Sequence, residues 1–206
     1  MLNFLRFKSK RNLVLTLASL VGIAVICSMA AGESEACLAV MYPQSAGLFG
    51  SLGAASALVF ANLGSAYGAA KSGVGVAYLG VSAPEKIMRG IVPVVMAGIL
   101  GIYGLIIAVI INNNIKTDKY TYSSYAGYLH LGAGLAAGMA ALASGLSIGV
   151  VGDTAARAYG KQDQIFVAMV LMLIFSEALG LYGLIIALLM NNQANRYTDL
   201  CAGTLQ

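Results

Sequence analysis

Long unbroken runs of apolar residues are the feature that most constrains how this chain can fold. A run of roughly 18 or more apolar residues with few charges is typical of a helix that crosses a membrane. Only 10% of the 206 residues are charged, against about 25% in a soluble domain. The sequence therefore predicts an all-α membrane protein with little chain left for a water-soluble domain. Five runs meet the criterion: Leu13–Ala31, Gly47–Ala70, Ile91–Ile111, Leu131–Val151 and Phe166–Met190.

The first forty residues allow two interpretations. Four basic residues precede an apolar run, and small residues follow it at 28–32, which is the layout of a cleaved signal peptide. The same layout also fits an extra membrane helix that is retained. In both cases the basic cluster stays in the cytoplasm, so we expect Lys71 and Arg157 at cytoplasmic helix ends. Without this cluster the chain is neutral, so its net charge of +4 gives no reason to expect nucleic-acid binding. The cluster consists of Arg6, Lys8, Lys10 and Arg11.

An internal repeat organises the rest of the chain. The segment GIYGLIIAVIINN (101–113) matches GLYGLIIALLMNN (180–192) at nine of thirteen positions, with an offset of 79 positions. The sequence therefore predicts a four-helix transmembrane double hairpin made by tandem duplication. The first hairpin covers residues 43–113, the second covers 126–192, and both follow the N-terminal segment 1–42. Upstream glycines match at an offset of 81 positions: Gly53, Gly64 and Gly68 with Gly134, Gly145 and Gly149.

The two helices of each hairpin differ in composition. The first carries Gly or Ala at every third or fourth position, which gives a flat face that lets two helix backbones approach closely. The second is rich in Leu, Ile, Val and Met. We therefore expect the first helix of each hairpin to pack tightly inside an assembly and the second to face lipid.

One acidic residue lies inside an apolar run. Glu177 has eleven residues of its run before it and thirteen after it, which places it near mid-bilayer at about 1.5 Å per residue. An acid there costs roughly 2.5–3.5 kcal/mol. Hydrocarbon disfavours its ionised form and water favours it, so we predict that Glu177 takes up and releases a proton. Its equivalent in the first copy of the repeat is Gly98, so two hairpins share a single acid.

Two other interpretations of Glu177 stay open. It could pair with a cation inside the helix bundle, although the other apolar runs contain no Lys, Arg or His. It could instead hold sodium, for which the runs offer oxygen atoms from Ser176, Tyr103 and Tyr182 near that depth. These oxygens are few for a sodium site. The three cysteines form no metal-binding spacing, so we expect no metal and no cofactor.

Three smaller signals are predicted to be structural. Asp153 and Arg157 are four residues apart and are expected to form an i,i+4 surface pair, with contact to a partner as the alternative. His130 is expected to be a polar residue at a membrane interface. The stretch 64–72 contains Gly and Lys but lacks the order of a phosphate-binding loop. We therefore expect no nucleotide site and no enzymatic activity in this chain.

With these motifs the chain resembles the proteolipid c subunits of vacuolar-type rotary ATPases. The resemblance covers about residues 43–192, in matching order and spacing. It departs from the family by some forty added residues before Pro43. The longer double-prime relatives also have an extra helix, but they keep their acid where this chain has Gly98, so the resemblance favours the plain or prime form. Four segments carry it: SAYGAAKSGVG (65–75), IVPVVMAGILGIYGLIIAV (91–109), LGAGLAAGMAALASGLSIGVVGD (131–153) and IFSEALGLYGLIIALLM (174–190).

The resemblance implies a ring of identical and paralogous c-type subunits in the lipid bilayer. Proton flow past stator subunit a accompanies rotation of the ring, and a central stalk links the ring to a separate sector that hydrolyses ATP. The essential glutamate of the family maps onto Glu177. The expected location is the membrane of vacuoles or other acidic organelles, and also the plasma membrane. The alternatives are a pore-forming or membrane-contact proteolipid without energy coupling, and a sodium-driven rotor.

Overall fold

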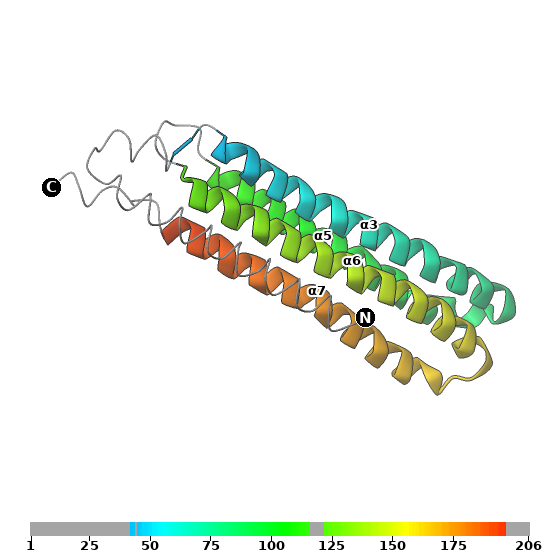
Figure 1. Ribbon diagram of the computed structural model, residues 1–206. Coiled ribbons are helices and arrows are strands. Elements are labelled where there is room, and N and C mark those ends of the chain that lie inside the picture. The colour runs from blue at the N-terminus through cyan, green and yellow to red at the C-terminus, as the bar shows by residue number, and fades with distance from the viewer. Residues whose placement is uncertain (1–41, 44, 116–121, 197–206) are drawn as a thin grey trace, which may run out of the picture. The chain divides into compact units, whose positions relative to one another are not determined.

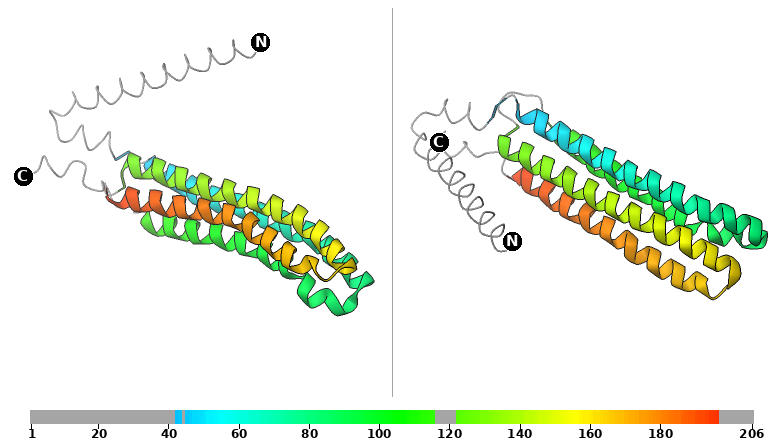
Figure 2. Two further views of the ribbon diagram at one scale, coloured as in Figure 1. Left: turned by 90° about the horizontal axis from the view of Figure 1, so that it is seen from below. Right: turned by 45° about the vertical axis from the view of Figure 1, so that its right-hand side comes forward.

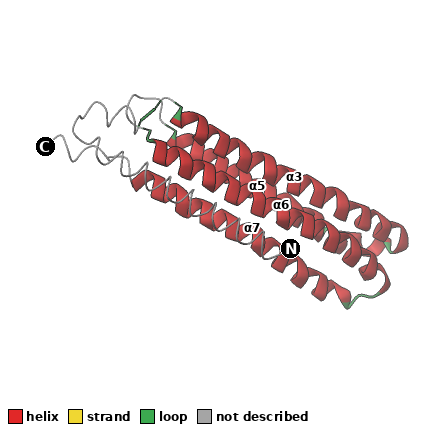
Figure 3. Cartoon of the chain, in the orientation of Figure 1, coloured by secondary structure: helices red, strands yellow, loops and turns green. Residues whose placement is uncertain are grey.

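The computed structural model describes residues 42–43, 45–115 and 122–196, together with all side chains of these residues except that of Arg196. These residues form no strand, and their four long helices lie in one compact unit, residues 44–198 (Figures 1 and 3). The prediction for residues 1–42, including the run Leu13–Ala31, falls almost entirely outside the described residues. The elements are α3 (Ala46–Ser82), η1 (Pro84–Lys86), α4 (Ile87–Gly90), α5 (Val92–Asn114), α6 (Ser124–Lys161) and α7 (Ile165–Arg196).

Four described helices are long and apolar enough to cross a membrane, which confirms the four predicted spans after the N-terminal segment. They contain 31 to 38 residues each when η1 and α4 are counted with α5. A hydrocarbon core about 30 Å thick needs only ~20 residues of helix. All four helices are therefore longer than the hydrocarbon requires, and the charged residues Lys71 and Asp153 lie toward the C-terminal ends of α3 and α6.

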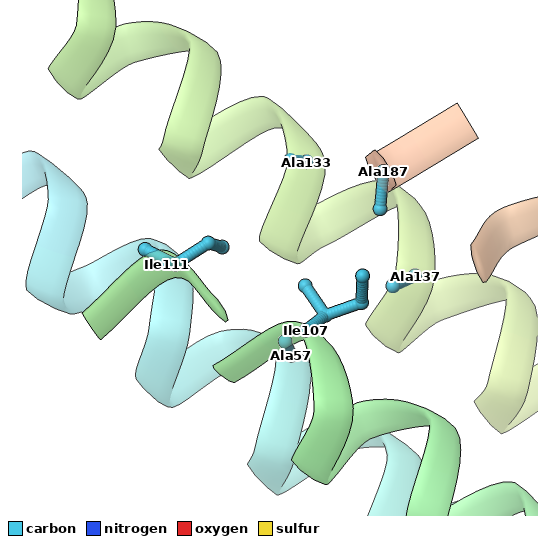
Figure 4. Packing of buried hydrophobic residues seen from close by; sticks show 6 residues of the cluster. All are labelled: Ala57, Ile107, Ile111, Ala133, Ala137 and Ala187. Carbon is cyan, nitrogen blue, oxygen red and sulfur yellow. The ribbon is translucent and has the colours of Figure 1, made fainter. Parts of the chain in front are cut away.

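The helices run side by side as two hairpins, α3 with α5 and α6 with α7 (Figure 2). The most extensive contact joins α3 to α6, and each of the other two helices packs mainly against the inner helix of its own hairpin. α3 and α6 are thus the inner pair, and α5 and α7 are the outer helices. A cluster of buried apolar residues lies where the four helices meet (Figure 4). It contains Ala57, Ile107, Ile111, Ala133, Ala137 and Ala187.

The inner pair is in contact through glycines, as the sequence predicted. A Cβ atom added to Gly134 would meet the backbone of Gly53, and one added to Gly145 would meet the backbone of Gly64. A Cβ atom on Gly149 would lie 3.2 Å from the Cα atom of Gly68. The three glycine pairs that match at an offset of 81 positions are therefore contact partners, which their match in the sequence did not reveal.

The outer helices dock in the same way in both hairpins. Gly104 of α5 lies against Ala57 and Ala61 of α3. Gly183 of α7 lies against Ala136 and Ala140 of α6, and each of these residues is 79 positions after its counterpart. The spacing of 79 therefore relates one hairpin to the other, while the spacing of 81 relates residues that face each other between them.

Large apolar side chains are exposed along all four helices, most densely along α7. On that helix Phe175 is 74% exposed and Leu189 is 59% exposed. A soluble monomer rarely exposes so much contiguous apolar surface. Such a surface suits contact with lipid or with other membrane helices, and α7 supports the prediction that the outer helices face lipid.

Candidate functional site

Glu177 lies in the middle part of α7 and contacts the other hairpin. Its side chain is half-buried, and the hydroxyl of Tyr103 on α5 donates a hydrogen bond of 2.9 Å to its Oε1 atom. Of the two tyrosines that the sequence offered near this depth, the structure brings only Tyr103 to the acid. Tyr182 lies five residues further along the same helix as Glu177 and is 62% exposed.

No ion pair among the described residues involves Glu177. The ion pairs join Lys71 and Arg157 to Asp153, and Lys86 to Asp163. All of them lie near the C-terminal ends of α3 and α6. The described part of one chain therefore gives no support for the interpretation that Glu177 is permanently paired with a cation. The hydrogen-bond partner that the structure gives Glu177 is the neutral hydroxyl of Tyr103.

The place that corresponds to Glu177 in the first hairpin is open. Gly98 is exposed on α5, and a Cβ atom added there would have no neighbouring atom within 4 Å. Tyr182, the counterpart of Tyr103, has no hydrogen bond to a side chain of the first hairpin among the described contacts. The two hairpins thus share their packing but differ at the position that carries the acid.

Two residues near the acid were missed by the sequence analysis. Ser144 and Ser147 on α6 both form hydrogen bonds with Ser176, the residue before Glu177. Sequence periodicity alone gave no reason to single them out, since serine is also common among small residues in tightly packed helices. The signal that could have found them is that two hydroxyls, three residues apart, share one helix face at the depth of the acid.

Asp153 is not the surface residue that was expected. Its i,i+4 pair with Arg157 is present, with Arg157 Nε 2.8 Å from Oδ1. However, Asp153 is 7% exposed, and Lys71 of α3 approaches Oδ2 to 3.2 Å. The expected pair is therefore present, but its surface position was wrong: α3 packs against the backbone of Asp153 at Gly75, and Lys71 of α3 reaches the carboxylate. Asp153 joins the inner helices at this end.

The connections between helices are joined at the same end. Lys86 of η1 forms an ion pair of 2.6 Å with Asp163, which lies between α6 and α7. Its ammonium also lies 5.7 Å from the centre of the Tyr159 ring. The turns of the two hairpins are therefore tied to each other across the end of the bundle.

At the opposite end, His130 is also more buried than the sequence suggested. It is 1% exposed, and its Nδ1 atom lies 2.6 Å from the hydroxyl of Tyr122. Asn114 of α5 donates a hydrogen bond of 2.9 Å to Asn191 of α7 near this end. These contacts join helix ends. No group of three or more His, Cys, Asp or Glu residues that could hold a metal ion occurs in the described ranges.

Comparison with known proteins places the chain in a family. The model of the ATP synthase C subunit family matches twice, at residues 52–111 and 131–190. A V-type proton ATPase 16 kDa proteolipid subunit from Chrysotila carterae is 57% identical over 154 residues, covering 73% of this chain and 94% of that protein. The 16 kDa proteolipid c subunit of the human V-type proton ATPase is 51% identical over 151 residues, covering 73% and 96%. The V-type proton ATPase c subunit of Candida tropicalis is 47% identical over 154 residues, covering 75% and 94%. The chain therefore belongs to the ATP synthase C subunit family, within the group of V-type proton ATPase proteolipids.

Proposed function

We propose that this chain is a proton-conducting subunit of the rotor ring of a V-type ATPase, with Glu177 as the proton carrier. The observation that carries the proposal is an acid near the middle of a membrane-crossing helix, with a hydroxyl as its hydrogen-bond partner. Its relatives, whose alignments cover 73% of this chain, carry names that agree with proton transport. The chain itself is non-catalytic, and a separate sector supplies the energy of ATP hydrolysis.

The chemistry at Glu177 is a reversible proton transfer. When the acid faces lipid it is neutral, and Tyr103 donates to Oε1 while the proton resides on Oε2. When rotation brings it to an aqueous cleft beside stator subunit a, the proton leaves and the carboxylate is hydrated. Moving one charge across 100 mV is worth about 2.3 kcal/mol, comparable to the cost of burying the charge. The Tyr103 hydroxyl can donate to the acid in both states.

Identical and paralogous copies are the proposed partners within the ring. The glycine contacts between α3 and α6 supply the packing pattern that we propose for inner helices of neighbouring copies. α3 carries a second row of exposed residues, most of them small, which leaves room for the α6 helix of another copy. This row contains Ser51, Ala55, Val59, Asn62, Ala66 and Ala70.

The other features of the chain receive proposals that follow from this role. Residues 43–113 and 126–192 are the two proteolipid repeats, and residues 1–42 are a signal peptide or an added helix. The end of the bundle with Asp153 faces the cytoplasm and the central stalk. The subunit resides in vacuolar or other endomembranes, where the pump acidifies the lumen.

The test is replacement of Glu177 by Gln, which keeps the size of the side chain but cannot exchange the proton. We expect Glu177→Gln to assemble normally and to lower ATP-driven proton uptake into vesicles at least 100-fold. A proteolipid that only forms a pore or a membrane contact would show unchanged proton uptake. The conservative change Glu177→Asp, which keeps an acid at a shorter reach, is expected to retain part of the activity.

The sodium-driven alternative needs a separate measurement. Carbodiimides react with a protonated carboxyl group, so they label Glu177 when it carries a proton. Added sodium should leave the labelling of a proton carrier unchanged at constant pH. Protection of Glu177 by millimolar sodium would contradict the proposal and favour a sodium site.

A further inference from the structure

Three serines join α6 to the turn of α7 that carries Glu177. The Ser144 hydroxyl donates a hydrogen bond of 2.7 Å to the backbone oxygen of Ser176, and Ser147 Oγ lies 2.9 Å from Ser176 Oγ. Ser144 is fully buried and Ser176 is 7% exposed. Because Ser176 directly precedes Glu177, these bonds hold the backbone at the site of the acid.

A buried serine in a helix does not need a neighbouring helix to satisfy its hydroxyl. Ser72 of α3 is equally buried, and its hydroxyl donates to the backbone oxygen of Gly68 in its own helix at 2.7 Å. Such back-bonding is the usual local solution for serine in a helix. The Ser144 hydroxyl instead donates to α7. It therefore links two helices, which a hydrogen bond within α6 would not do.

Gly180 lies beside this contact, and its space is limited by Leu100 rather than by Ser144. A Cβ atom added to Gly180 would lie 3.5 Å from the Cβ and Oγ atoms of Ser144 and 2.8 Å from Leu100 Cδ2. Gly180 is one turn after Ser176, and a carbonyl oxygen can accept two hydrogen bonds. The oxygen of Ser176 can therefore keep its bond within α7 and still accept the hydroxyl of Ser144.

α7 is held from two directions at this level. Ser176 is bonded to α6, and Glu177 is bonded to Tyr103 of α5. Adjacent residues of a helix point about 100° apart, because a turn takes ~3.6 residues. Bonds in two such directions restrain rotation of the helix about its own axis, which bonds in a single direction would restrain less.

The first hairpin lacks most of this link, as it lacks the acid. At the equivalent positions of the first copy, Gly68 stands in place of Ser147 and Ala97 stands in place of Ser176. Only Ser144 has a serine counterpart, Ser65. The hydroxyl pair therefore occurs in the hairpin that carries Glu177 and is absent from the hairpin that carries a glycine in its place.

We propose that Ser144 and Ser147 are positioning residues for Glu177, which fix the rotation of α7 so that the Tyr103 hydroxyl reaches Oε1. This inference rests on the proposed function of Glu177 as a proton carrier. The bond from Tyr103 stabilises an ionised acid more than a neutral one. Loosening α7 weakens this bond.

The experiment measures the pH at which carbodiimide labelling of Glu177 is half-maximal, in membranes that contain the assembled complex. The variants are Ser147→Ala and the double variant Ser144→Ala with Ser147→Ala. We expect the double variant to raise the midpoint by up to about 0.9 pH unit. This upper bound is the free energy of two interhelical hydrogen bonds expressed in pH units. Ser147→Thr, which keeps a hydroxyl, should restore the midpoint toward that of the unaltered chain. Ser72→Ala is the matched control, because it removes a buried serine that bonds only within its own helix.

Three results would overturn the inference in different ways. An unchanged midpoint in the double variant, together with a shifted midpoint in Tyr103→Phe, would show that the serines do not position the acid although Glu177 carries protons. Failure of both serine variants to assemble would show that the link is purely structural. Absence of Glu177 labelling in the unaltered chain at every pH would instead contradict the proposed function itself.

Discussion

The two hairpins of this chain share one packing scheme and differ in chemistry. In both, a glycine of the outer helix lies against two alanines of the inner helix, Gly104 in the first hairpin and Gly183 in the second. Only the second hairpin has an acid at mid-span, Glu177, where the first has the open position Gly98. The shared packing shows that the acid is not needed to hold a hairpin together. The difference supports the proposal that the acid serves proton transport rather than packing.

The largest effect is expected where the shared packing is broken. A Cβ atom on Gly145 would meet the backbone of Gly64, which cannot move aside as a side chain can. We expect Gly145→Ala to separate the inner helices and to reduce the amount of assembled subunit in membranes severely, since overpacking typically costs about 1–3 kcal/mol. The measurement is the yield of the chain in purified complex.

Gly98→Ala is the matched control for this prediction. A Cβ atom there meets no atom of the described residues within 4 Å, and Ala is favoured over Gly in a helix by about 1 kcal/mol. The yield of Gly98→Ala should equal or exceed that of the unaltered chain. If both variants assemble equally well, the glycines are not what brings the inner helices together.

A middle-sized effect is expected from a pair of tyrosines that the duplication relates. Tyr103→Phe removes the hydroxyl that bonds to Glu177, and a hydrogen bond to a charged group contributes about 1.5–3 kcal/mol. We expect the midpoint of carbodiimide labelling to rise by about one pH unit, because the lost bond favoured the ionised acid. Tyr182→Phe removes a hydroxyl that forms no hydrogen bond with Glu177, so it should leave the midpoint unchanged. Equal shifts in the two variants would mean that the hairpins do not differ as proposed.

The smallest effect is expected at the ion pair that ties the hairpins at their turns. Lys86→Ala removes the pair with Asp163, whose side chain is 75% exposed. Exposed ion pairs typically contribute 0 to about 1 kcal/mol. The midpoint of thermal unfolding in detergent should therefore fall by no more than a few degrees, and high salt should reduce the difference between the variant and the unaltered chain. A large loss of stability would show that the two turns depend on each other more strongly than their packing suggests.

The sequence was sufficient for the features that depend on position along a helix. Apolar runs predicted the four spans, and counting residues within its run predicted that Glu177 lies in the middle part of α7. The close approach of the inner helices followed from their glycines. Such features depend only on rise per residue and on residue size, which every helix shares.

Features that depend on how helices rotate against each other could not be predicted. Tyr103 and Tyr182 looked equivalent until the structure showed which one faces the acid. The burial of Asp153 depends on how α3 packs against α6, and the serine link depends on the rotation of α7. Periodicity identifies the faces of a helix, but it does not say which neighbour each face meets.

The open position at Gly98 has a consequence for the energetics of the proposed motor. If each subunit contributes a single acid, a ring of these chains moves one proton for every four helices that pass the stator. A ring of the same circumference with an acid on every hairpin would move twice as many. When fewer protons cross per revolution, more of the free energy of ATP hydrolysis is available to move each proton. Such a ring can therefore build a steeper pH gradient, but it moves protons more slowly.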